Sequence, residues 1–260
     1  MDRFDAISYE LDYIERQNDV RIIYACESGS RAWGFASPDS DFDVRFVFVR
    51  PISDYLRLSP PKDTIEWSIP AENNGVGADF DASGWDLRKF LLLLRKHNPS
   101  AVEWLGSPIV YREESRFWRL RDLDLECFDP VSSAWHYHGM AESTVKGRLK
   151  GEKVPAKGYL YVIRAILAAR WSISRFEPVP VPFGKLRDAM MPAELAHEVE
   201  RMLVIKLSGA ENGLVGHSEA LDGWISDELE ALPDEIRRYQ GRQAPDIGKF
   251  DAIFRMFVGL

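Results

Sequence analysis

Two aspartates, Asp41 and Asp43, stand at the start of an aromatic and β-branched stretch that otherwise predicts a buried strand. Successive side chains of a strand point to opposite faces, so the two carboxylates share one face, with Cα atoms about 7 Å apart. Neighbouring carboxylates repel one another unless a proton or a cation lies between them. Hard oxygen ligands suit Mg²⁺, and two such ions about 4 Å apart are typical of phosphoryl-transfer sites. The pair therefore predicts a magnesium site.

A third carboxylate is expected from a neighbouring strand. The stretch "ADFDA" offers Asp79 and Asp81 on one face, again with an aromatic residue opposite. We favour Asp81, because it lies nearer the end of this strand, where a helix follows; Asp79 is the alternative. Asp39 lies in a loop and indicates a turn, whereas Asp86 is expected to stabilise the start of the following helix through the helix dipole.

A Gly-Ser pair, Gly29 and Ser30, precedes the aspartates. Glycine lets the backbone approach an anion closely, and exposed N–H groups with a serine hydroxyl can cradle phosphates. The pair alone is more typical of a plain turn between two strands. A strand, Gly-Ser, Asp-x-Asp in a second strand and a later acid nevertheless form a specific combination. Arg31 and Arg45 stand close enough in sequence to hold phosphate oxygens. Arg45 shares the face of Asp43, so an ion pair with an aspartate is its alternative role.

Hydrophobic periodicity predicts the elements that position these residues. The expected fold class is α+β, because strands come first and helices follow. We predict a mixed α/β catalytic part in residues 1–112 and an α-helical domain in residues 113–260. The expected strands are 20–26, 42–49, 63–69 and 76–82, with helices at 4–17, 85–97, 113–127, 131–149, 156–176, 192–208, 218–231 and 246–257, and a Pro-rich connector at 177–184.

Composition limits the class of protein. The chain has 260 residues, of which 45% are hydrophobic and 28% charged, as is ordinary for a soluble globular protein. A net charge of -8 argues against nonspecific coating of nucleic acid. We find no apolar run of membrane-spanning length and no signal-peptide layout, and two cysteines make neither a disulfide framework nor a zinc site. We therefore expect a cytoplasmic protein without a membrane partner.

A basic stretch interrupts this acidic chain between residues 141 and 175. Lys157 and Arg164 belong to its aromatic-rich helix start and are candidates to hold a triphosphate or stack a base. Packing in a domain interface is the alternative role for both. Lys146 and Arg148 are weaker candidates, since a charge run is usually a solvated helix face.

The run "GSRAWGFASPDSDFDVRF" resembles the signature of the DNA polymerase beta-like nucleotidyltransferase superfamily. More narrowly, "ESGSRAWGF", "SDFDVRF", "GWDLRKFLLLLRKHNPS" and "EWL" resemble the predicted nucleotidyltransferases associated with bacterial RNA-repair systems. The later "KGYLYVIRAILAARW" and "PVPF" are similar as well, so the resemblance covers most of the chain. It implies a mixed-sheet nucleotidyltransferase core followed by a helical substrate-binding domain.

The resemblance also implies roles for particular residues. Asp41 and Asp43 match the metal-binding pair. Asp81 matches the third carboxylate, which in the superfamily helps to activate the attacking hydroxyl. Gly29 and Ser30 match the turn that holds the triphosphate.

The resulting prediction is an enzyme that moves a nucleoside monophosphate from an NTP, such as ATP, to an acceptor hydroxyl. Two Mg²⁺ ions are the expected cofactor, with Mn²⁺ as a substitute. The resemblance makes an RNA 3′ end in RNA repair the leading acceptor, implies a functional link to an RNA ligase or kinase, and favours nucleotide binding by Lys157 and Arg164. The alternatives are nucleotidylation of a protein or a small molecule, and a non-catalytic module that binds NTP or RNA.

Overall fold

The computed structural model describes residues 3–209 and 213–260, and residues 1–2 and 210–212 lie outside the description. The chain forms two compact units, each with a core of its own. Unit 1 comprises the described part of residues 1–32 together with 41–127 and 244–260. Unit 2 comprises 33–40 and the described part of 128–243.

This division differs from the single boundary that the sequence predicts after residue 112. Helices α6 (Trp118–Cys127) and α12 (Ile247–Val258) belong to unit 1, because their apolar faces are buried in its core. Residues 33–40 belong to unit 2, because Phe35 is buried in the core of that unit. The assignment of catalysis to one part and substrate binding to the other stays a prediction.

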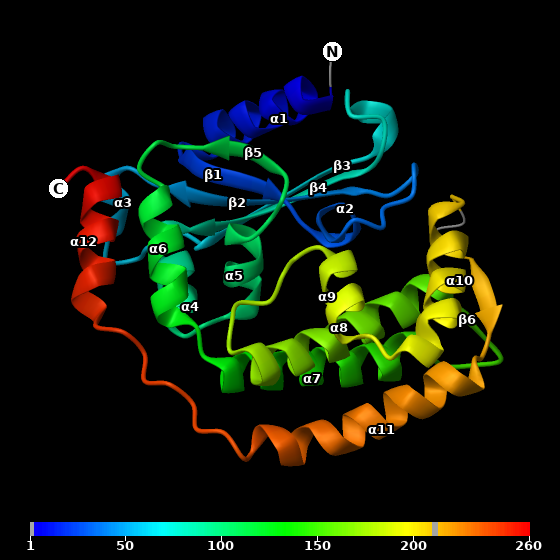
Figure 1. Cartoon of the computed structure of the whole chain (residues 1–260). Helices are drawn as coiled ribbons and strands as arrows, with labels where there is room; N and C mark the ends of the chain where they lie inside the picture. The colour runs from blue at the N-terminus through cyan, green and yellow to red at the C-terminus, as the bar shows by residue number, and fades with distance from the viewer. Residues whose placement is uncertain (1–2, 210–212) are drawn as a thin grey trace. The chain divides into compact units, whose positions relative to one another are not determined.

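Among the described residues, unit 1 is built on a five-stranded sheet with the order β3-β4-β2-β1-β5 (Figure 1). Strands β2 and β4 are parallel and the other neighbours are antiparallel, so the sheet is mixed. This confirms the α+β prediction. The strands are β1 (Arg21–Glu27), β2 (Phe42–Val49), β3 (Thr64–Ile69), β4 (Phe80–Asp86) and β5 (Val110–Glu113).

One face of β2 packs into an apolar core. Val44, Phe46 and Phe48 are buried there together with residues of helix α1 (Arg3–Asn18), which covers this face of the sheet (Figure 1). These side chains alternate along the strand, as the period of a half-buried strand requires. The alternation leaves the opposite face of β2 for Asp43 and Arg45.

That opposite face is covered by helices α4 (Leu87–Arg95) and α5 (Pro99–Leu105), together with α6 and α12 (Figure 1). The carboxylate of Asp86 accepts a hydrogen bond of 2.8 Å from the backbone N–H of Arg88. It thus caps α4, which confirms the role expected for this residue at the start of the helix. Short helices α3 (Ile52–Tyr55) and η1 (Ala71–Asn73) lie in the connections before and after β3.

Unit 2 is mainly helical, and α8 (Ala156–Arg175) is buried along most of its length. The elements packed around it are α7 (Pro130–Arg148), α9 (Phe183–Met190), η2 (Ala193–Leu195), α10 (Ala196–Leu207), α11 (Glu219–Ile236) and a ribbon of β6 (Lys153–Pro155) and β7 (Leu214–Gly216). The ribbon and α9 are not among the predicted elements. Three-residue strands carry no periodic pattern, and their pairing joins residues far apart in the sequence. Among the described helices, none combines the length and hydropathy needed to cross a membrane.

Candidate active site

The predicted Gly-Ser turn is the first turn of a short helix, α2 (Gly29–Trp33), which follows β1. Gly29 has a φ of 58°, in the left-handed region that favours glycine. A Cβ at this position would overlap Oδ2 of Asp43. The backbone N–H of Ser28 donates a hydrogen bond of 2.8 Å to the carbonyl of Asp43, and Ser30 is buried beside it. Glycine is therefore needed here for a close approach to the Asp-x-Asp segment.

Asp43 and Asp81 are direct partners in the parallel pairing of β2 and β4. The register places the two residues on the same face of adjacent strands. Arg45 contacts both, with Nη2 lying 3.3 Å from Oδ1 of Asp43 and 3.6 Å from Oδ2 of Asp81. Its Nη1 also donates to the carbonyl of Val44 at 3.0 Å. The ion-pair role considered for Arg45 is therefore present, and it involves two aspartates.

Asp79, the alternative third carboxylate, is held by backbone groups at the start of β4. Its Oδ1 accepts a hydrogen bond of 2.9 Å from the N–H of Ala71, and its carbonyl accepts one of 2.8 Å from Phe42. Asp81 instead is the second residue of β4, opposite Asp43. The strand runs from Phe80 to Asp86 and not over 76–82, so Asp81 lies near its start and the expected position near its end was wrong. The pairing with Asp43 favours Asp81 as the third carboxylate, and its catalytic role stays a prediction.

Asp41 is exposed and lies directly before β2. Arg31 from α2 donates from Nε to the carbonyl of Asp41 at 3.0 Å. The guanidinium of Arg31 also lies 3.8 Å from the ring centroid of Phe42. These contacts place a cation beside the backbone that leads from Asp41 into Asp43, and phosphate binding by Arg31 stays a prediction.

The carboxylates of this face are hard oxygen donors of the kind that Mg²⁺ prefers. Among the described residues, no group of three or more His, Cys, Asp or Glu side chains is already arranged as a metal site. In unit 1 the guanidinium of Arg45 contacts both Asp43 and Asp81. The donor set fits Mg²⁺, and an ion that took the two oxygens contacted by Arg45 would displace this guanidinium.

Glu27, which sequence reasoning does not single out, lies directly behind Asp43. It is only 1% exposed, and its Oε1 accepts a hydrogen bond of 2.8 Å from the N–H of Asp43. Its Oε2 accepts a hydrogen bond from the hydroxyl of Tyr111. Burial raises the pKa of Glu27 to about 7. The available signal was its place in the sequence, as an acid that ends an apolar strand immediately before the Gly-Ser segment.

A cavity of about 300 Å³ borders Arg45 and Asp81. Its wall includes Trp85 and Trp104, whose rings stack with centroids 3.9 Å apart. Hydroxyl and carboxylate groups make up much of the remaining wall, so the cavity offers hydrogen-bond acceptors and aromatic surface beside the third carboxylate. These groups belong to Ser28, Glu66, Ser83, Ser100 and Glu103.

Lys157 and Arg164, predicted to bind nucleotide, lie on α8 in unit 2, and their position relative to the carboxylates of unit 1 is not described. Arg164 is only 1% exposed, and its Nη2 donates to the carbonyl of Val181 at 3.3 Å. Its guanidinium lies 4.3 Å from the ring centroid of Trp33. These are the contacts of a packed side chain, and nucleotide binding by Arg164 stays a prediction. Lys157 is half-buried at the start of α8.

Comparison with known proteins gives one family. The sequence profile of the RNA repair pathway DNA polymerase beta family matches residues 4–256. A relative from Bacillus subtilis (strain 168), described as "Uncharacterized protein YcgL", is 39% identical over 236 residues, which cover 90% of this chain and 88% of that protein. The crystal structure of a nucleotidyltransferase-like protein from Exiguobacterium sibiricum 255-15 matches with a TM-score of 0.32 and 10% identity, over 91% of this chain and 75% of that one. The family match extends through both units.

Proposed function

Because the chain belongs to the RNA repair pathway DNA polymerase beta family and is a polymerase beta-like nucleotidyltransferase, we propose that unit 1 transfers a nucleoside monophosphate from an NTP to an acceptor hydroxyl. One observation carries the proposal. Asp43 and Asp81 are register partners on one face of the sheet, and the backbone of Gly29 lies against Asp43. The site thus combines carboxylates with a segment suited to phosphates.

In this proposal Asp41, Asp43 and Asp81 would hold two Mg²⁺ ions, for which Mn²⁺ would substitute. Bound Mg²⁺ would neutralise the triphosphate and stabilise the charge that develops on the transferring phosphoryl group. Gly29 and Ser30 present backbone N–H groups and a hydroxyl to the phosphate oxygens.

Proton transfer and charge neutralisation fall to the side chains around that segment. Asp81 accepts the proton of the acceptor hydroxyl while the hydroxyl oxygen attacks the α-phosphorus. The bond between the α-phosphorus and the pyrophosphate leaving group breaks in line with that attack. Arg31 holds phosphate oxygens, and Arg45 leaves the carboxylates to do the same. We keep Lys157 and Arg164 of α8 as candidate nucleotide-binding residues.

We propose an RNA 3′ end as the acceptor, in a repair reaction functionally linked to an RNA ligase or kinase. The RNA-repair description of the family supports this choice. The cavity beside Asp81 supports it as well, because Trp85 and Trp104 provide aromatic surface on which a terminal base can stack. Its hydroxyl and carboxylate groups are suitable partners for ribose hydroxyls.

The test is labelling of RNA by α-labelled NTPs, each offered separately with Mg²⁺ and then with Mn²⁺. The RNA carries either a 3′-hydroxyl or a 3′-phosphate, so that the acceptor group is identified. Asp43→Asn and Asp81→Asn are each expected to lower labelling at least about a hundredfold, because both remove a charged oxygen ligand. Asp122→Asn, a change of an exposed residue on α6, is the matched control and is expected to label normally.

The outcomes separate the proposed acceptor from the proposed chemistry. Unchanged labelling by Asp43→Asn would show that the metal-pair assignment is wrong. Label that appears on protein or on a small molecule in place of RNA, and still requires Asp43, would leave the transfer chemistry intact and replace the acceptor. NTP binding with no transfer to any of these acceptors would favour a non-catalytic binding module.

A further inference from the structure

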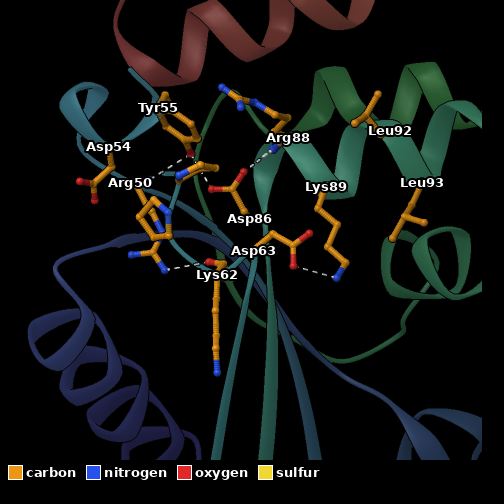
Figure 2. A pocket seen from close by; sticks show the side chains of 12 residues that line it. Arg50, Asp54, Tyr55, Lys62, Asp63, Asp86, Arg88, Lys89, Leu92 and Leu93 are labelled. Carbon is orange, nitrogen blue, oxygen red and sulfur yellow. Dashed lines mark hydrogen bonds and ion pairs between the residues drawn. The ribbon is translucent and has the colours of Figure 1, made fainter. Parts of the chain in front are cut away.

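A second cavity in unit 1, of about 510 Å³, lies beside Arg50 and Asp86 (Figure 2). Strands β2 and β4 run in parallel from Asp43 and Asp81 toward Arg50 and Asp86. Arg50 and Asp86 line this cavity, so it is separate from the candidate active site. Its volume lies within the range of small-molecule sites, roughly 300–1,000 Å³.

Two guanidinium groups of the cavity contact backbone carbonyls or aromatic rings. Arg50 donates to the carbonyls of Asn18 and Lys62, at 3.5 and 3.1 Å. The guanidinium of Arg88 lies over the rings of Tyr55 and Phe254, at 5.0 and 5.3 Å from their centroids. Within the described part of the chain, neither guanidinium forms an ion pair with a carboxylate. Both therefore keep donors and positive charge for an anion.

The aspartates of the cavity wall are occupied by other partners. The carboxylate of Asp86 accepts hydrogen bonds of 2.8 Å from the hydroxyl of Tyr55 and from the N–H of Arg88, and burial raises its pKa (Figure 2). The carboxylate of Asp63 lies 3.1 Å from Nζ of Lys89. The cavity wall carries four cationic side chains against three aspartates, and the carboxylate of Asp86 interacts electrostatically with both arginines. The wall thus has one more positive than negative charge, although the chain as a whole carries a net charge of -8. The cationic residues are Arg50, Lys62, Arg88 and Lys89, and the aspartates are Asp54, Asp63 and Asp86.

The rest of the wall is largely apolar, with surface from Tyr55, Pro60, Pro61, Leu92 and Leu93. Leu92 is 46% exposed, which makes this apolar surface accessible from solvent. A ligand that matches both the guanidinium groups and the apolar wall of the cavity combines a negatively charged group with a ring or another apolar group.

We propose that this cavity binds a small organic anion. A phosphate or carboxylate group of the ligand contacts Arg50 and Arg88, and an apolar ring packs against Tyr55 and the two prolines. The site is distinct from the nucleotidyl-transfer site, so the proposal does not depend on the proposed function.

Phenyl phosphate and benzoate are the first probes, because they share a ring and differ in the anion. Benzyl alcohol lacks the charge and inorganic phosphate lacks the ring. Binding is measured by NMR titration of the full chain in EDTA, which removes divalent ions from the active site. At least one of the two ring-bearing anions is expected to bind about tenfold tighter than benzyl alcohol and inorganic phosphate. Amide shifts are expected in residues 50–63 and 86–93.

Two pairs of variants test the location. Arg88→Gln changes an exposed side chain and is expected to weaken binding about tenfold, whereas Arg116→Gln, at another exposed arginine, leaves binding unchanged. Leu92→Glu places a negative charge at the cavity and is expected to weaken binding. Leu125→Glu adds the same charge at a leucine on α6 that is 66% exposed, and serves as its control.

The preferred probe identifies the source of the charge, phosphate or carboxylate. Equal binding of benzyl alcohol and the two anions would overturn the role of the guanidinium groups. Equal binding of inorganic phosphate and phenyl phosphate would overturn the role of the apolar wall. Shifts at Gly29 and Ser30, or binding that Arg88→Gln leaves unchanged, would overturn the proposed location.

Discussion

Asp43 and Asp81 face one another across the parallel strands β2 and β4, and the single guanidinium of Arg45 contacts both carboxylates. Two carboxylates in this position require a positive charge between them. In the structure Arg45 supplies that charge, and in the proposed loaded enzyme Mg²⁺ takes over part of this role. Arg45 and Mg²⁺ are therefore expected to compete for the same oxygens.

Replacement of Arg45 tests this competition. Arg45→Met is expected to lower the free energy of unfolding in EDTA by about 1–2 kcal/mol, because the carboxylates repel one another and hydrogen bonds to two carbonyls are lost. Mg²⁺ is expected to raise the Tm of the variant more than that of the parent. Arg57→Met, which breaks an exposed pair with Asp54, is the control. Equal responses of parent and Arg45→Met to Mg²⁺ would contradict the shared site.

Substitution of Gly29 tests the close approach of α2 to Asp43. Gly29→Ala is expected to destabilise the protein by about 1–2 kcal/mol and to abolish most nucleotidyl transfer, because the new Cβ displaces the Asp43 carboxylate. Gly77→Ala is a matched control, since Gly77 also has a positive φ, of 82°, but a Cβ there meets nothing within 4 Å. Equal activities of the two variants would show that Gly29 contributes only its backbone conformation.

Lys206 anchors the segment 33–40, which connects the Gly-Ser helix to Asp41. It is 2% exposed, and its Nζ donates to the hydroxyls of Ser37 and Ser40 at 2.7 and 3.0 Å. Lys206→Met is expected to lower stability by about 1–3 kcal/mol and to increase proteolysis within 33–40. Limited proteolysis followed by mass spectrometry measures the effect.

The control for this variant is Lys185→Met, which changes an exposed lysine on α9. It is expected to leave both stability and cleavage unchanged. Similar cleavage of the two variants within 33–40 would rule out the anchoring role of Lys206.

Asp124 on α6 makes stability depend on pH. Burial raises its pKa to about 7, and its enclosed Oδ1 has no hydrogen-bond partner in the described structure. The folded state therefore holds the proton more tightly than the unfolded state, and this contribution to stability is lost as pH rises from about 4 to about 7. Asp124→Asn is expected to remove that loss, so that at pH 8 its free energy of unfolding exceeds that of the parent by about 2 kcal/mol.

Urea unfolding of Asp124→Asn at a series of pH values between about 4 and 8 measures this effect. The control is Asp122→Asn, which changes an exposed residue of the same helix. A pH profile of Asp124→Asn that parallels that of the parent would exclude Asp124 as the source.

The predictions from sequence succeeded where the signal was local. Alternating apolar residues predicted β2 with its observed ends, and the same alternation placed Asp43 and Arg45 on one face. The cap at Asp86 was also a local signal. The family resemblance rested on motifs of this local kind.

Tertiary structure alone decided which distant residues meet. The pairing of β2 with β4 skips β3, so no local pattern could reveal that Asp81 is the register partner of Asp43. The return of α12 to unit 1 and the burial of Arg164 beside Trp33 depend equally on contacts between segments far apart in the chain. Periodicity determines which face of an element is apolar, whereas the choice of partner for that face is made by the packing of the whole chain.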